Sequence, residues 1–426
     1  MNAKLTVLAI AFAMYAVVIV IPRRKAWAAV GAACLLVILG IVSPSRALGT
    51  HVNWSVLMIY AGALAIAELV IYSRVPARVA DEIVRRSKNV GVAVVAILMM
   101  TGLVSAFVDN VSTVLVMAPI AIALSKKIRI APTYFMVGLA VMANLQGTAT
   151  LVGDPPSMIF ASFARYGFND FFVNEGRPSI FFVVQVGMLA GAAFFYCHFS
   201  KNGSEKVDIA PEPIVSPVPT VLLGLMILGL AVNSFLGSGI SPVSGLYVVA
   251  LAVSGLLWFR FARRESRERT FALVRALDWE TLVFLAGIFV VVGAVADVGL
   301  LGDFAAFLAG LVGDSVLLGF VAIIGVSVLL SGFVDNVPYI IAMLPVAARI
   351  SEGLGLKPEL YLFAILVGSC LGGNLTPFGA SANVVAVGLL GKEGIHVGFP
   401  EWLRIGLPFT LITTLAASAF LWLVWR

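Results

Sequence analysis

Two Asp-Asn pairs interrupt long apolar stretches of the chain, Asp109-Asn110 in 90–124 and Asp335-Asn336 in 316–348. A carboxylate in an apolar surrounding can bind a cation or exchange a proton. Asp and Asn are also strong helix N-caps, and a capping residue can still coordinate an ion. Both readings stay open from the sequence.

Polar residues and prolines also interrupt two apolar helices, expected over 134–160 and 360–386. Proline removes a backbone donor and glycine loosens a helix, so both helices should unwind inside the membrane. Freed carbonyls and side-chain oxygens can then bind a cation, while exposed helix N-termini suit an anionic or polyhydroxyl solute. The residues expected to bind solute or ion are Asp109, Asn110, Thr113, Asn144, Gly147, Thr148, Thr150, Asp154, Asp335, Asn336, Asn374, Thr376, Ser381 and Asn383.

Three of these residues, Asp109, Asp154 and Asp335, are the expected proton-coupling groups. Charges at the bilayer centre cost roughly 2.5–3.5 kcal/mol each, so three would cost on the order of 8–10 kcal/mol unless protons or cations neutralise them. The sequence suggests no intramembrane Lys or Arg to pair with them. Asp154 could instead occupy a surface turn, and Glu68 is expected to be a snorkelling or paired residue outside the site.

The composition defines the class of protein that must position these groups. Hydrophobic residues make up 61% of the chain and charged residues 12%, and mean hydropathy is +1.05. These values exclude a soluble enzyme and a nucleic-acid binder and indicate an all-α polytopic membrane protein. The sequence has no phosphate-binding loop motif and no metal-ligand spacing, so we expect neither an enzyme nor a cofactor or metal site.

Ten apolar segments are long enough to be full spans, and charge decides how the two longer stretches are arranged. If both are re-entrant hairpins, 21 of the 28 Lys and Arg residues fall on one face, which predicts that this face is cytoplasmic. Both termini are then extracytoplasmic, and the expected location is the plasma membrane. Segments 74–88 and 300–314 are expected to be amphipathic interface helices. The ten spans are 5–21, 27–43, 54–72, 134–152, 178–199, 219–237, 243–259, 281–299, 360–379 and 403–424.

The chain also resembles itself when Asp109 is aligned with Asp335. In this repeat alignment, positions 101–160 and 327–386 share 17 identities over 60 ungapped positions, and the Asp-Asn pairs coincide. The sequence therefore predicts two repeats of opposite topology, 1–200 and 219–426, each with five spans and one hairpin. Segment 201–218 is the expected cytoplasmic linker.

The motifs Phe107-Val-Asp-Asn-Val, Gly147-Thr-Ala-Thr-Leu-Val-Gly-Asp-Pro-Pro and Gly379-Ala-Ser-Ala-Asn-Val-Val resemble the arsenite permease and sodium–proton antiporter (ArsB/NhaD) branch of the ion transporter superfamily. The P protein of that superfamily is similar too. The resemblance implies a homodimer with a scaffold part and a transport part that moves as an elevator, and it places the ligands at the hairpin tips and broken helices.

Three functions follow as hypotheses. The first is proton-coupled efflux of arsenite or antimonite, because a neutral hydroxylated solute suits a cavity lined by acids and amides. The second is sodium–proton antiport, and the third is transport of an organic or inorganic anion, which acids at both tips disfavour. The expected partners are a small solute, a coupling ion (H⁺ or Na⁺) and a second copy of the chain. A separate ATPase subunit is compatible with the sequence.

Overall fold

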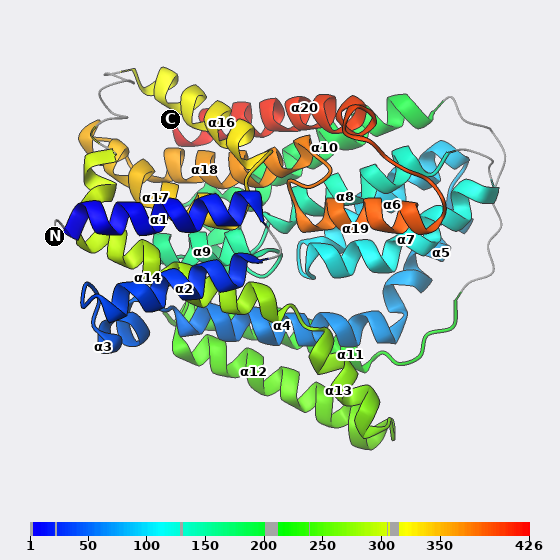
Figure 1. Ribbon diagram of the computed structural model, residues 1–426. Helices are drawn as coiled ribbons and strands as arrows, with labels where there is room; N and C mark the ends of the chain where they lie inside the picture. Colours follow the sequence, from blue (N-terminus) through cyan, green and yellow to red (C-terminus); the bar gives the residue numbers. More distant parts are fainter. Residues whose placement is uncertain are drawn as a thin grey trace.

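The computed structural model describes residues 3–21, 24–127, 131–200, 212–237, 239–304, 306 and 315–426. Its architecture is almost entirely helical (Figure 1), apart from a short antiparallel ribbon of β1 (Val173–Asn174) and β2 (Arg177–Pro178). Six helices in the described part are long and apolar enough to cross a membrane. This confirms the predicted all-α polytopic membrane protein.

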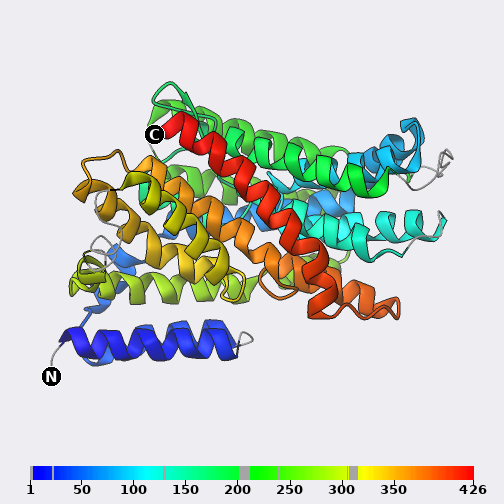
Figure 2. The same cartoon turned by 90° about the horizontal axis from the view of Figure 1, so that it is seen from above.

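The helices form two groups that pack mainly within themselves. The α4 group lies in the lower part of Figure 1, except for α1, which Figure 2 shows along one outer edge. It consists of α1 (Ala3–Val20), α2 (Lys25–Ile38), α4 (Trp54–Ser73), α11 (Val218–Leu236), α12 (Pro242–Leu257) and α14 (Trp279–Asp297). The α8 group consists of α6 (Val90–Ser105), α7 (Asn110–Lys127), α8 (Thr133–Gly147), α9 (Pro155–Ala164), α10 (Ile180–Phe199), α16 (Val316–Ser331), α17 (Asn336–Gly353), α18 (Glu359–Gly372), α19 (Ser381–Lys392) and α20 (Phe399–Trp425).

Shorter elements connect these helices or lie at the ends of the molecule. The helix α5 carries basic residues in its last turn, and it follows α4 directly. The short elements are α3 (Pro44–Arg46), η2 (Ala47–His51), α5 (Val75–Arg86), η3 (Asn169–Phe171), η4 (Trp258–Ala262), α13 (Arg267–Ala276) and η5 (Gly373–Leu375).

Helix bounds recur in the two aligned segments of the chain. In the repeat alignment, the first residues of α6, α7, α8 and α9 coincide with the first residues of α16, α17, α18 and α19. The caps recur as well: the side chain of Asn89 accepts from the backbone of Val92, and Ser315 accepts from Leu318. In Figure 1 the pair α6–α7 lies on the right and the pair α16–α17 on the left, with their connections toward the middle.

Both central helices are interrupted at the predicted places. The helix α8 ends at Gly147, and α9 begins at Pro155, whose ring fixes φ for the first helical turn. The helix α18 ends at Gly372, and α19 begins at Ser381 after the single turn of η5. Nearly all side chains of α8 and α18 are buried, so these two helices form the core of the α8 group.

Some predicted segments differ from the observed ones. The span expected over 27–43 is a helix of 14 residues, because Gly40 adopts a φ of +70° and Pro44 begins a new helix. The linker residues 201–211 lie outside the described residues, as does most of the interface helix expected over 300–314.

Candidate functional site

A pocket of about 190 Å³ lies between the two helix groups. Four helices of the α8 group point their N-termini at it, since Asn110, Pro155, Asn336 and Ser381 are the first residues of α7, α9, α17 and α19 and all line it. The N-terminus of a helix carries a partial positive charge and unpaired N–H groups. The pocket therefore combines four donor-rich helix ends in one small space.

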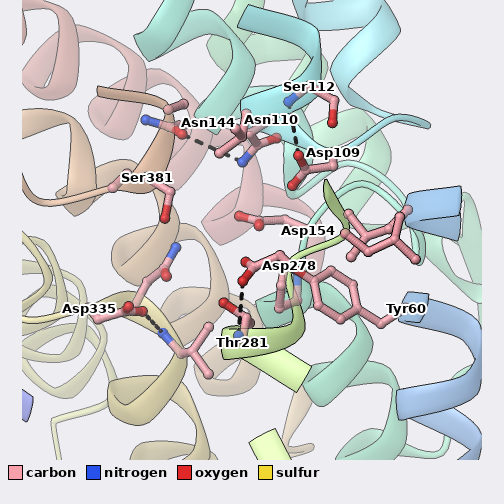
Figure 3. A pocket seen from close by; sticks show the side chains of 18 of the residues that line it. Tyr60, Asp109, Asn110, Ser112, Asn144, Asp154, Asp278, Thr281, Asp335 and Ser381 are labelled. Carbon is pink, nitrogen blue, oxygen red and sulfur yellow. Dashed lines mark hydrogen bonds between the residues drawn. The ribbon is translucent and has the colours of Figure 1, made fainter. Parts of the chain in front are cut away.

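Acidic side chains line the same pocket. They come from both groups: α4 and the start of α14 supply Glu68 and Asp278, and the helix breaks and tips supply Asp109, Asp154 and Asp335. Figure 3 shows the carboxylates of Asp109, Asp154 and Asp278 directed toward the centre of the pocket. Asp154 interacts repulsively with both Asp109 and Asp335. The five acids thus share one electrostatic environment.

Three of these acids also cap helices. A side-chain oxygen of Asp109 accepts from the backbone N–H of Ser112 at 2.9 Å, and Asp335 accepts from Val337 at 3.0 Å. Asp278 accepts from Thr281 at 3.0 Å. Each cap uses one carboxylate oxygen, so the second oxygen of each acid can accept a bond from another partner.

One lysine faces the acids, which the sequence analysis did not expect. Among the described residues that line the pocket, Lys25 is the only basic one, and its Nζ lies 3.3 Å from Oδ2 of Asp335. The expectation that no Lys or Arg would pair with the three aspartates is therefore wrong for Asp335. Lys25 begins α2, and the sequence placed it in a cytoplasmic loop because it follows Arg23 and Arg24.

Other pocket residues of the α4 group were missed as well. Tyr60 donates to Asp278 over a long 3.5 Å contact, and Thr281 and Glu68 line the pocket beside them. Glu68 was set aside because it lies near the end of an apolar span, yet its carboxyl group is close enough to Asp109 for the two to repel each other. No repeated motif marks these residues, so the sequence offers no signal that would have identified them as a group.

Four asparagines connect the two halves of the chain at the pocket, and two of them, Asn110 and Asn144, also line it. Asn144 of α8 donates to Oδ1 of Asn374 at 2.9 Å and of Asn383 at 2.8 Å. Its own oxygen accepts from Asn110 at 3.5 Å. All four side chains are buried, so this network orders the first tip and the second break together.

In both helix breaks, a threonine hydroxyl bonds to the backbone of the neighbouring hairpin turn. Thr150 donates to the carbonyl oxygen of Ala106, and Thr376, its counterpart in the repeat alignment, donates to that of Gly332 at 2.6 Å. Each hydroxyl therefore ties a break to the neighbouring hairpin turn. These two hydroxyls bond to backbone carbonyl oxygens, and neither threonine lines the pocket.

The structure brings half of the fourteen predicted site residues to the pocket. Those that line it are Asp109, Asn110, Asn144, Asp154, Asp335, Asn336 and Ser381. The other seven, Thr113, Gly147, Thr148, Thr150, Asn374, Thr376 and Asn383, do not line it. Within the described residues, no three His, Cys, Asp or Glu side chains converge as ligands of a metal ion.

The sequence is similar to one protein family and to several known proteins. Residues 15–368 match the family CitMHS, described as citrate transporter. The uncharacterized transporter Rv2685 of Mycobacterium tuberculosis is 29% identical over 409 residues, 94% of each chain. The human P protein is 25% identical over 406 residues, which cover 77% of this chain and 48% of the P protein.

Solved structures share the fold. The YdaH transporter of Alcanivorax borkumensis matches with a TM-score of 0.60 and 16% identity over 99% of this chain and 98% of its own. MtrF of Neisseria gonorrhoeae, from a class of antimetabolite efflux pumps, matches with a TM-score of 0.56 and 15% identity over 91% and 83%. The chain belongs to the CitMHS citrate transporter family, and it is a multi-pass secondary transporter of the ion transporter superfamily.

Proposed function

We propose that this transporter couples export of arsenite or antimonite to the entry of protons at the acidic pocket. The observation that carries the proposal is the ratio of five carboxylates to one lysine in one pocket between the helix groups. Each charge held inside the membrane without a partner would cost roughly 2.5–3.5 kcal/mol at the bilayer centre. Bound protons or cations remove that cost, which makes the acids the coupling groups.

The size and chemistry of the pocket support a small neutral solute. Arsenous acid is an uncharged trihydroxide at neutral pH, so it avoids repulsion by the acids. Its hydroxyls can bond to amides and hydroxyls that line the pocket, among them Asn110, Asn144 and Ser381. A volume of about 190 Å³ suits such a solute with a few waters.

Citrate or another organic anion is the second candidate. It is favoured by the family's description, by Lys25 and by the four helix N-termini at the pocket. Because the acids outnumber the lysine, an anion would need to bind together with cations.

The proposed movement is an elevator in a homodimer. The α4 group would be the fixed scaffold and the α8 group the moving part, with the two repeats inverted in the plasma membrane and both termini outside. This division is supported by the sparse contacts between the groups and by the position of the pocket between them.

Flux into proteoliposomes with an imposed pH gradient tests the function. The proposal predicts uptake of arsenite when the lumen is acidic, with collapse of the pH gradient, and no uptake of citrate. A matched Glu352→Gln variant, which changes an exposed acid outside the pocket, should transport like the parent. Uptake of citrate alone would favour the second candidate, and proton movement driven only by Na⁺ or Li⁺ would favour cation–proton antiport. No flux of any of these would reject the proposal.

A further inference from the structure

Asp335 is held by two different helices. One carboxylate oxygen accepts from the backbone of Val337 in its own helix α17, and the other accepts from Lys25 of α2 at 3.3 Å. Both side chains are largely buried, with 17% of Lys25 and 30% of Asp335 exposed. Because α2 belongs to the α4 group and α17 to the α8 group, this ion pair joins the two groups.

The equivalent acid in the first half has a different environment. Asp109 is the counterpart of Asp335 in the repeat alignment and likewise uses one oxygen to cap its helix, at Ser112. Within the described ranges, however, neither Asp109 nor Asp154 forms an ion pair with a basic side chain. Two tips with the same Asp-Asn sequence therefore differ in charge, since only Asp335 is neutralised by the protein.

A lysine ammonium carries the same charge as a proton or an alkali cation. An acid paired with lysine therefore needs no transported cation to be neutral, whereas an unpaired acid does. We propose that Lys25 takes the place of one coupling cation at Asp335, so that exchange with the solution is left to the acids that have no basic partner, Asp109 and Asp154 among them. This inference rests on the proposed cation coupling and specifies its stoichiometry.

Lys25 has further favourable neighbours besides Asp335. Asp278 and Glu280, at the start of α14 in the α4 group, also attract Lys25. The face of Phe284 lies 5.5 Å from its Nζ. The ammonium thus keeps favourable neighbours on its own side.

The charge carried per solute tests the inference. The full-length chain is reconstituted, and the membrane potential at which net arsenite flux is zero is measured at several proton gradients; citrate serves as the probe if only citrate is transported. The Lys25→Gln variant should carry one more positive charge per solute than the parent, because Asp335 must then take a cation. Lys25→Arg should keep the parental ratio, since the fixed charge remains.

Two further variants control for structural damage. Lys4→Gln removes the lysine of an exposed pair with Asp303, 2.8 Å apart and outside the pocket, and should leave both flux and ratio unchanged. Lys25→Gln combined with Asp335→Asn removes both charges, so any flux should return to the parental ratio. Thermal midpoints in detergent identify variants that do not fold.

An active Lys25→Gln variant with the parental ratio would overturn the inference while leaving proton coupling intact. If Lys25→Gln is inactive, the double variant decides: flux at the parental ratio supports the inference, and a folded but inactive double variant contradicts it. If neither arsenite flux nor citrate flux in the parent responded to any imposed cation gradient, the proposed coupling would be rejected. The inference would then be rejected with it.

Discussion

The carboxamide of Asn144, in the first half of the chain, donates to Oδ1 of Asn374, in the second half, over 2.9 Å. The repeat alignment pairs Asn144 with Cys370, so the second half has no asparagine at the equivalent position. A bond in the other direction comes from a different pair of groups: the Asn374 amide donates to the backbone carbonyl oxygen of Val141 in α8 at 3.4 Å. The helix α8 and the break of the opposite half therefore hold each other.

Replacement of Asn144 by Ala should destabilise the protein and reduce transport together. Removal of the amide leaves buried acceptors on Asn374 and Asn383 without this donor, a change that typically costs about 1–3 kcal/mol. Thermal unfolding in detergent and arsenite flux measure the two effects. In the control, Asn174→Ala, only a bond to Tyr166 outside the pocket is lost, and flux should persist. Full flux in Asn144→Ala would show that the network has no role in transport.

The threonines of the two breaks should both stabilise the fold, and Thr150 more than Thr376, because its Oγ1 also accepts from the backbone N–H of Val152 at 3.3 Å. Thr150→Val and Thr376→Val each leave a buried carbonyl, of Ala106 or Gly332, without its hydroxyl donor. We expect each to lower the free energy of unfolding by about 1–3 kcal/mol. Chemical or thermal denaturation in detergent provides the measurement.

Thr410 offers a matched control for these two variants. Its hydroxyl is buried, and within the described part of the chain it has no hydrogen-bond partner. Thr410→Val should therefore leave stability unchanged or raise it slightly, because an unsatisfied polar group is removed. If all three variants behaved alike, the hydroxyl bonds at the breaks would not be what stabilises them.

Two glycines allow the backbone to fold back on itself at the breaks. A Cβ on Gly153 would lie 2.5 Å from the carbonyl oxygen of Gly147, and one on Gly379 would lie 2.6 Å from that of Gly373. Alanine at either position should cost about 1–3 kcal/mol through overpacking. Gly388→Ala in α19 meets no atom within 4 Å and should be neutral or stabilising. Thermal midpoints compare the three, and an unaffected Gly153→Ala would contradict the close approach.

The sequence predicted those parts of the site that interrupt long apolar segments. The Asp-Asn pairs and the Gly- and Pro-containing breaks stand out because polar and helix-breaking residues are costly inside apolar helices. Lys25, Glu68 and Asp278 lie instead near the ends of apolar segments, where charge is ordinary. Only tertiary packing shows that these ends meet at one pocket.

The division of roles among the predicted polar residues also required the structure. Residues such as Asp154 and Ser381 line the pocket, whereas Thr150 and Thr376 bond to backbone carbonyls and do not line it. The spacing of these residues in the sequence could not distinguish the two groups. A helix break turns the chain away from helical periodicity, so the direction of each side chain cannot be derived from the sequence there.

The Asp109→Asn variant should show whether Asp109 takes part in proton coupling or serves only as a helix cap. Asparagine is as good an N-cap as aspartate, so the bond to the backbone of Ser112 and the thermal midpoint should be kept. The amide cannot take up a proton, and we therefore expect pH-driven arsenite flux to fall to the level of empty liposomes. Asp335→Asn should behave differently, because it leaves Lys25 without its ion-pair partner and should lower the thermal midpoint. Parental flux in a folded Asp109→Asn protein would remove this carboxylate from the coupling mechanism and limit it to its role as a cap.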